Sequence, residues 1–277
     1  MPINFLKTII QQKGANCSER ESWVKITPSN SCARYLEGIY QFNRIEQTSE
    51  HWIFNDGYPT LLFFPNEKDC VSINNDGDIS CITSGWVDGG VIKNVYVNYM
   101  SNMDYLLVVR FHPHSFHQLF GLDSRFFQNR SIVDLSTIDV DGLFLNQFFA
   151  QKTIEQKIQC IESFIEKIAP QDTNKGLIDW AIRIIHEERG QISVSNLVKQ
   201  IGVNYKWLER NFSSHVGITP KEYIQLQRFA SAYVCLYDNP LDLTTVAIAN
   251  GYYDYNHFLK KFKDFTGKTP LEYLSIR

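Results

Sequence analysis

Two sets of side chains near the carboxy-terminal end combine residue types that suit DNA bases with a spacing that places them on one side of a helix. The first set is Lys206, Glu209, Arg210 and Ser213, and the second is Asn256, Leu259, Lys260 and Lys263. Arginine and lysine can bind guanine, asparagine suits adenine, glutamate suits cytosine, and leucine can contact a thymine methyl group. Lysines at helix ends more often contact phosphate. The two sets predict two surfaces for duplex DNA; the alternative is solvated faces on a small helical bundle.

The segments that carry these two sets repeat each other at an offset of 50 residues. Residues 204–223 read NYKWLERNFSSHVGITPKEY, and residues 254–273 read DYNHFLKKFKDFTGKTPLEY. Seven of the twenty positions are identical, and several others exchange similar residues. A match of this length indicates that a whole supersecondary unit is duplicated.

Each repeated unit has the pattern of a helix-turn-helix. In the first unit, Gly202 follows an amphipathic segment, Asn204 is a preferred helix cap, and Leu208 and Phe212 lie four residues apart on one helical face. Thr219-Pro220 then predicts the start of another helix. The second unit repeats these features, with one extra residue in its turn. A short glycine-containing turn between two helices is typical of units whose second helix enters the major groove.

The repeat resembles the DNA-binding domain of the AraC/XylS family of bacterial transcription regulators. The resemblance covers about residues 175–277 and rests on Ala247, Gly251-Tyr252, His257-Phe258, Phe262-Lys263, Gly267, Thr269-Pro270 and Tyr273. Arg228 stands where the family has an arginine in the helix that joins the units. The resemblance implies binding of two successive major-groove segments on one face of DNA. Leu274, where the family often has arginine, and Glu209 depart from the pattern.

The charge distribution agrees with a nucleic-acid partner for the carboxy-terminal part. The chain carries 27 Lys and Arg against 30 Asp and Glu, a net charge of −3. Residues 175–277 hold 13 Lys and Arg and 10 Asp and Glu, a net charge of +3. The remaining residues hold 14 Lys and Arg and 20 Asp and Glu, a net charge of −6. A surplus of three positive charges is modest, so it predicts weak non-specific binding with a shallow salt dependence.

The amino-terminal half is predicted to be rich in β-strands. Apolar or alternating runs cover residues 35–44, 60–65, 71–83, 91–99 and 105–111, and Asn75-Asp76-Gly77-Asp78 is a hairpin signal. We therefore expect an α+β chain, with a β-barrel at residues 1–140, helical linker or dimerisation segments at 141–174, and the DNA-binding domain at 175–277.

The stretch VVRFHPHSFHQLFGL resembles part of a cupin-like sensor domain that precedes many AraC-type domains. It rests on Arg110, Phe111, Pro113 and Phe116, and His114 stands where the family often has glycine. The resemblance implies a small-molecule effector. Candidate effector-binding residues are Trp52, Trp86, Arg110 and His112; aromatic side chains line ligand pockets but also fill barrel cores.

Three histidines, at positions 112, 114 and 117, lie close together where a predicted strand leads into a predicted helix, and they leave a second function open. Three imidazoles could bind zinc, copper or iron, so the alternative is a metal-dependent sensor or enzyme of the cupin type. We expect no metal and no cofactor, because the glutamate that accompanies such histidines in metal cupins is absent from the segment. The chain has no G-x-S-x-G, P-loop or H-E-x-x-H motif, and we expect no enzyme.

A helical segment over residues 143–169 is expected to join the two parts. Its isoleucines, at positions 154, 158, 161, 165 and 168, have heptad spacing. They would form a dimerisation or signal-transmitting helix or, as we favour for two short heptads, pack against the β-barrel. Residues 169–175 are a polar linker.

The cysteines and the hydropathy favour a cytoplasmic protein. The six cysteines are scattered, no signal peptide precedes them, and no apolar run is long enough to span a membrane. We expect free, mostly buried thiols. Expected partners are double-stranded DNA and a small-molecule effector, with RNA polymerase and a second copy of the chain as further candidates. The sequence leaves activation or repression, the effector and the operator open.

Overall fold

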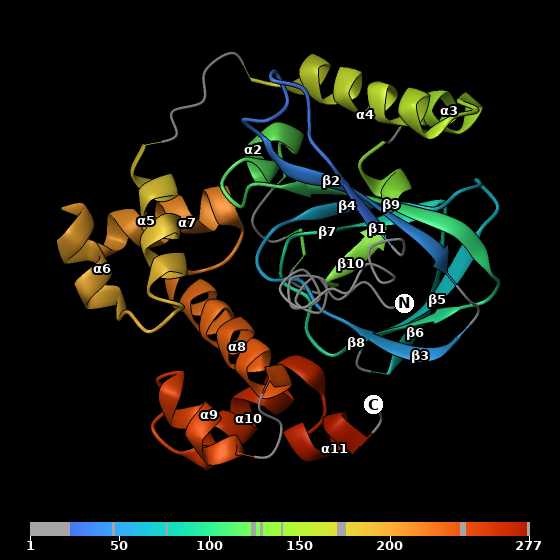
Figure 1. The fold of residues 1–277 in the computed structure, drawn as a ribbon. Coiled ribbons are helices and arrows are strands. Elements are labelled where there is room, and N and C mark those ends of the chain that lie inside the picture. Colours follow the sequence, from blue (N-terminus) through green and yellow to red (C-terminus); the bar gives the residue numbers. More distant parts are fainter. Residues whose placement is uncertain are drawn as a thin grey trace.

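The protein consists of an amino-terminal β domain and a carboxy-terminal helical domain, which agrees with the expected α+β class (Figure 1). The computed structural model describes residues 23–45, 48–75, 77–122, 126–127, 130–139, 141–170, 176–238 and 242–275. In Figure 1 the helical domain lies along one side and the lower edge of the β domain.

The β domain contains two antiparallel sheets. The larger sheet has the order β1 (Trp23–Ile26), β2 (Leu36–Ile45), β9 (Met103–Phe111), β4 (Thr60–Phe63), β7 (Gly85–Asp88) and β10 (Ile132–Asp134). The smaller sheet has the order β3 (Thr48–Ile53), β8 (Val95–Tyr99), β5 (Cys70–Asn75) and β6 (Asp78–Thr83). The facing sides of the two sheets enclose one apolar core.

The central strands of the larger sheet are apolar on both faces because both faces are covered. Leu62 and Val108 point into the core between the sheets, whereas Leu61 and Val109 pack under helices on the outer face. Successive side chains of a strand point to opposite faces, so a continuous apolar run such as TLLF fits a strand that is buried on both sides.

The helices on that outer face are α2 (Phe116–Phe120), α3 (Leu143–Ala150) and α4 (Ile154–Ile168), with a 3-10 turn, η2 (Leu135–Thr137), before α3. The prediction of one continuous helix over 143–169 is wrong. The chain is extended at Gln151, and Thr153 caps α4 through a reciprocal pair of hydrogen bonds with Gln156. Ile161 and Ile165 are fully buried in the cluster beneath the larger sheet, so packing against the β domain is confirmed for these isoleucines.

Five predicted β segments correspond to observed strands, and four short strands were not predicted. Strand β8 begins at Val95 rather than at residue 91, and the 71–83 segment splits into β5 and β6. Of the hairpin signal, Asp76 lies outside the described residues. The unpredicted strands are β1, β3, β7 and β10.

The cysteines differ from the expectation of mostly buried thiols. The five in the described ranges are free, but only Cys32 is buried, and Cys81 is exposed. In the β5–β6 hairpin Cys70 lies opposite Thr83 and Cys81 lies opposite Ser72, so these two thiols are diagonal neighbours rather than direct partners. Cys17 lies outside the described residues.

The helical domain contains α5 (Gly176–Glu187), α6 (Val194–Ile201), α7 (Tyr205–Val216), α8 (Pro220–Asp238), α9 (Leu243–Ala249), α10 (Tyr255–Thr266) and α11 (Pro270–Ser275). Helix α8 joins the two repeated units, and its 19 residues make it about 28 Å long. Arg228, the joining-helix arginine expected from the resemblance, donates from Nε to the carbonyl oxygen of Gly190, 2.9 Å away. Among the helices of the described ranges, none is both long and apolar enough to cross a membrane.

The β domain contributes directly to the core of the second unit. Trp52 and Phe54, at the end of β3, belong to the same buried cluster as Phe229 of α8 and Phe265 of α10. The ring of Phe54 lies 5.0 Å from that of Phe229 and 6.1 Å from that of Phe265, between centroids. The buried cluster of the first unit is built only from helical-domain residues within the described chain.

A polar network crosses between the domains beside this aromatic contact. Buried Arg110 bonds both carboxylate oxygens of Asp56, at 3.0 and 3.2 Å, and its Nε donates to Glu37. The Asp56 carbonyl oxygen in turn accepts from the side chain of Gln227 of α8, at 2.6 Å. His186 of α5 lies at the same junction, where its Nε2 is 2.7 Å from the hydroxyl oxygen of Tyr223.

Truncating the aromatic contact should loosen both domains. We expect Phe54→Ala to lower the free energy of unfolding by about 3–5 kcal/mol, because it removes a fully buried ring and leaves a cavity. Urea unfolding measures the loss, and amide exchange should rise in α10 as well as in β8. The matched control is Ile79→Ala, at a side chain that is 69% exposed, which should change stability by no more than about 0.5 kcal/mol. Equal losses for the two variants would contradict the contact.

His186 should make the fold less stable in weak acid. Burial lowers the pKa of His186 below its ordinary value of 6.5; Asp56 acts to raise it and Arg110 to lower it. The unfolded chain therefore takes up this proton more readily, and the stabilisation present at neutral pH is lost as the pH falls through about 6.5. We expect His186→Gln, which cannot take up this proton, to lose less unfolding free energy than the unmodified chain between about pH 7 and about pH 5.

Comparing the His186→Gln variant with the unmodified chain cancels the contributions that other titrating groups make to the pH dependence of stability. Burial raises the pKa of Asp88 to about 6 against the effects of its hydrogen-bond donors. A raised carboxyl pKa stabilises the fold at low pH, and this contribution is lost as the pH rises toward 6, which is the opposite sign. Asp88 is present in both proteins, so its effect cancels. Identical pH dependence in the two chains would contradict the assignment to His186.

Candidate nucleic-acid interface

The two repeated units have matching turns and caps, as predicted. Gly202 and Gly251 adopt φ angles of 73° and 74° in the turns that precede α7 and α10. The Asn204 side chain accepts from the backbone N–H of Trp207 at 2.8 Å, and Asp254 accepts from that of His257 at 2.7 Å. These caps satisfy backbone donors that a helix start leaves open, and they fix where each second helix begins.

Helix α7 presents three different sides. Its inward side carries Leu208 and Phe212, both fully buried in the first unit's core. A second side, with Trp207 and Asn211, lines a pocket that the β domain also borders, and Trp207 packs there against the first unit's core. The third side carries the predicted set Lys206, Glu209, Arg210 and Ser213; Lys206 and Arg210 are exposed, and the other two are half-buried. The predicted contact face is therefore turned away from both the core and the β domain.

Helix α10 repeats this arrangement at the second predicted set. Phe258 and Phe262 are fully buried on its inward side. Among the predicted contact residues, Asn256, Lys260 and Lys263 are exposed, and Leu259 is half-buried. The structure thus places each predicted set on one open helix face.

The basic groups on these faces have few acidic partners. Within the described chain, no ion pair joins Lys206, Arg210, Lys260 or Lys263 to a carboxylate. Glu209 accepts from the hydroxyl of Tyr205, 3.1 Å away on the same helix, which holds the one acidic member of the sets at the start of α7. The four cations remain open to a phosphate or a base edge.

The β domain contacts the carboxy-terminal end of each of these helices at equivalent glycines. A methyl group added at Gly217 would lie 2.2 Å from Nε2 of His117 in α2, and one added at Gly267 would lie 2.0 Å from Oδ1 of Asn94. The end of α10 is also hydrogen-bonded to the β domain, because the Tyr96 hydroxyl donates to the carbonyl oxygen of Thr266 at 2.6 Å. No local pattern in the sequence marks these contacts, because they join residues more than 90 positions apart.

The four predicted effector-binding residues lie in different environments. Trp86 is buried in the core between the sheets, and Trp52 is buried in the second unit's core. Arg110 is held by Asp56 and Glu37, and His112 bonds the carbonyl oxygen of Ala33 through Nε2 at 3.3 Å. The structure does not gather these four into one cavity.

The three histidines of the alternative function are also separated in their contacts. The rings of His112 and His114 are stacked with centroids 5.8 Å apart, whereas His117 packs against Gly217 and Phe127. In the part of the chain that the structure describes, no three His, Cys, Asp or Glu side chains are placed to hold a metal ion.

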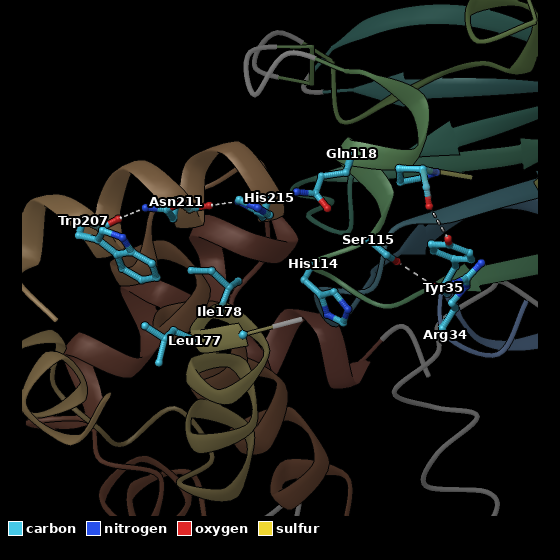
Figure 2. Close-up of a pocket in the computed structure, with 12 residues that line it drawn as sticks. Arg34, Tyr35, His114, Ser115, Gln118, Leu177, Ile178, Trp207, Asn211 and His215 are labelled. Carbon is cyan, nitrogen blue, oxygen red and sulfur yellow. Dashed lines mark hydrogen bonds between the residues drawn. The ribbon is translucent and has the colours of Figure 1, made fainter. Parts of the chain in front are cut away.

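A pocket of about 290 Å³ lies between the β domain and the first unit, and sequence reasoning did not identify it. Figure 2 shows Trp207, Asn211 and His215 along α7 on one side and Arg34 and Tyr35 of the β domain on the other. The residues that line it come from four separate segments of the chain, so no local pattern marks it.

Comparison with known proteins supports the helix-turn-helix assignment. A family model described as a helix-turn-helix domain matches residues 197–276. The uncharacterised HTH-type transcriptional regulator YtdP of Bacillus subtilis is 25% identical over 149 residues, which cover 51% of this chain and 19% of YtdP. The HTH-type transcriptional activator RhaS of Pectobacterium atrosepticum is 28% identical over 96 residues, or 35% of this chain and 33% of RhaS.

Two further similarities extend over most of the chain. RhaS of Mannheimia succiniciproducens is 23% identical over 220 residues, which cover 79% of this chain and 78% of that protein. A solved structure of ToxT from Vibrio cholerae aligns with 92% of this chain and 98% of its own, at 13% identity and a TM-score of 0.47. The chain itself spans only about a fifth to a third of the length of the first relatives, YtdP and RhaS of P. atrosepticum.

The matched segment contains α7 through α11, with both second helices and their exposed basic faces. The family model, the activators named among the relatives and the motif residues of the second unit agree. The carboxy-terminal region of this chain is an AraC-type domain with two helix-turn-helix units.

Proposed function

We propose that this chain is a sequence-specific DNA-binding transcription regulator whose helices α7 and α10 contact two successive major-groove segments. The observation that carries the proposal is the pair of open helix faces, each turned away from the core and from the β domain. A helix fits the major groove, where each base pair presents a distinct pattern of donors and acceptors.

The roles of individual residues follow from their chemistry and place. Arg210 and Lys260 occupy equivalent central positions and are assigned to guanine, and Asn256, in the first turn of α10, is assigned to adenine. Lys206 and Lys263 lie near helix ends and are assigned to phosphate. Glu209, Ser213 and Leu259 complete the two faces and would narrow the accepted bases.

The length of α8 suits two sites on one face of a duplex. Its 19 residues separate the units by a helix about 28 Å long, and successive major-groove segments on one face lie about 34 Å apart. In this proposal residues 175–277 form the DNA-binding domain, and residues 1–140 form a domain that senses a small molecule. The function is regulatory rather than catalytic, and RNA polymerase and a second copy of the chain are its further partners.

Selection of genomic DNA tests the proposal directly. Purified full-length protein is incubated with fragmented DNA of its own genome at moderate salt, and the retained fragments are sequenced. We expect enrichment of a few sites with two short blocks about one helical turn apart. Retention without a shared sequence in the fragments, with and without cell extract as a source of effector, would contradict a sequence-specific regulator.

Variants of the two central basic residues test the contact faces. We expect Arg210→Ala and Lys260→Ala each to weaken binding to a selected site by about 1–3 kcal/mol, because each removes a base contact. Specificity should relax in one block for each variant, and in different blocks for the two. Fluorescence anisotropy with the selected duplex and with single-base variants measures both effects.

The control for these variants removes the same charge elsewhere. Lys167→Ala changes an exposed lysine on α4, which packs on the β domain, and should leave affinity nearly unchanged. Lys263→Ala, at an assigned phosphate contact, should weaken all sequences alike and reduce the slope of log affinity against log salt by about 1. Unchanged affinity for both Arg210→Ala and Lys260→Ala would show that these faces do not contact DNA.

A further inference from the structure

The outer side of the β5–β6 hairpin carries two thiols that the proposed function does not use. Cys70 lies opposite Thr83, and Cys81 lies opposite Ser72, so the two cysteines are one diagonal step apart on the same side of the hairpin. This side faces solvent, since Cys81 is exposed and Cys70 is half-buried. Small molecules can therefore reach the pair.

The opposite side of the hairpin fixes the register that brings these thiols together. Val71, Ile73 and Ile82 alternate with the outward positions and are buried in the core between the two sheets. A shift of the strand pairing by one residue would turn these apolar side chains to solvent. The fold therefore keeps Cys70 and Cys81 beside each other, although neither thiol contributes to the core.

The two thiols interact directly, unlike the other cysteines with a described partner. The Cys81 thiol lies within hydrogen-bonding reach of the Cys70 thiol. Cys32, in contrast, donates to the carbonyl oxygen of Glu162, with the sulfur 3.6 Å away. The Cys235 thiol on α8 donates to the side chain of Asn250, 3.8 Å away. The hairpin thus holds two sulfur atoms together on an accessible surface.

A disulfide between these thiols needs only a small movement of one strand. Its two Cα atoms must come within about 7 Å, and diagonal neighbours on paired strands stand about 7–8 Å apart. Strand β6 is the outer strand of the smaller sheet, with β5 as its hydrogen-bonded neighbour there. It can approach β5 without breaking a second strand pairing in that sheet. A bond that requires such a movement is easier to reduce than a relaxed one.

We propose that Cys70 and Cys81 form a redox site, which hydroperoxides oxidise to a reversible disulfide within the hairpin. In the first step the exposed Cys81 sulfur attacks hydrogen peroxide; an S–O bond forms, the O–O bond breaks, and one water molecule leaves. In the second step the Cys70 sulfur attacks the resulting sulfenic acid; the S–S bond forms, the S–O bond breaks, and a second water molecule leaves. Two thiols and one peroxide thus give one disulfide and two water molecules. The inference does not depend on DNA binding.

The surroundings of the pair decide the product more than the rate. Desolvation raises the pKa of the Cys81 thiol above its ordinary value of 9.0, and Cys70 and Asp134 act in the same direction. Because the thiolate is the nucleophile, the first step is slow at neutral pH. Once the sulfenic acid has formed, the neighbouring Cys70 captures it before a second peroxide can convert it to an irreversible sulfinic acid. The site therefore responds to sustained oxidation.

Peptide mapping of the full chain tests the pair, because both cysteines lie on one tryptic peptide, residues 69–93. The protein is treated with hydrogen peroxide, alkylated with iodoacetamide and digested. We expect this peptide to lose both alkylation sites and to weigh two hydrogen atoms less than the unalkylated dithiol peptide. Dithiothreitol should restore both sites. Formation should be about tenfold faster at about pH 7.5 than at about pH 6.5, since the thiolate fraction rises tenfold per pH unit below the pKa.

The matched variants each remove one thiol. Cys70→Ser leaves Cys81 without a capturing thiol, so we expect a sulfenic acid that dimedone traps and that peroxide slowly converts to sulfinic acid. Cys81→Ser should leave Cys70 open to alkylation after the same treatment. The control is Cys160→Ser, which removes a half-buried thiol of α4 and should leave the rate of disulfide formation unchanged.

Three results would overturn the site. The first is a peptide 69–93 that keeps both alkylation sites after prolonged treatment of the unmodified chain. The second is a sulfinic acid on Cys81 beside a free thiol on Cys70, which would show that the two sulfur atoms do not meet. The third concerns amide exchange, which should slow in β5 and β6 on oxidation, because a cross-link restricts opening of the hairpin. Faster exchange would show that the bond forms only when the native register is lost.

Discussion

The arrangement of this protein depends on the aromatic contact that β3 makes with the second helix-turn-helix unit. Trp52 and Phe54, at the end of a strand, complete a core whose other buried members come from α8, α9, α10 and the turn between α9 and α10. Neither side could bury these rings alone, so the β domain and the second unit are parts of one packed body. The hydrogen bonds of Asn94 and Tyr96 to the end of α10 then fix the direction in which that helix points. The first unit is placed by α8, by the contact of His117 in α2 with the end of α7, and by the packing of Tyr58 against His186 of α5.

Helical periodicity explains how one helix serves three neighbours at once. Residues four apart lie on the same side of a helix. Leu208 and Phe212 therefore pack in the core together, and Trp207 and Asn211 both line the interdomain pocket. Lys206 and Arg210 remain exposed on the side that is left. A change at the pocket side of α7 can move the outer side without touching it, because the helix backbone is rigid over three turns.

The parts of the structure that follow from local chemistry could be predicted from the sequence, and the parts that depend on distant contacts could not. Asn204 and Asp254 cap helices through hydrogen bonds to backbone groups only three residues away. The local sequence pattern is therefore enough to predict their role. The role of Trp52, in contrast, could not be predicted from the sequence. An aromatic residue in a strand shows that something covers it, but the sequence cannot say whether this is a barrel core, a ligand or another domain. The same limit applies to Arg110, whose partners Asp56 and Glu37 lie 54 and 73 positions away.

The weak net charge of the helical domain makes simultaneous contact by both units important for DNA binding. With a surplus of only three positive charges over residues 175–277, phosphate attraction alone supplies little affinity, so binding depends on both units engaging together. When two modules are held in one molecule, the second binds at a high effective concentration only if the spacing fits, and the advantage disappears if geometry forbids simultaneous contact. A modest shift of α7 relative to α10 is then enough to change occupancy of the DNA. An effector achieves such a shift only by binding one arrangement more tightly than the other.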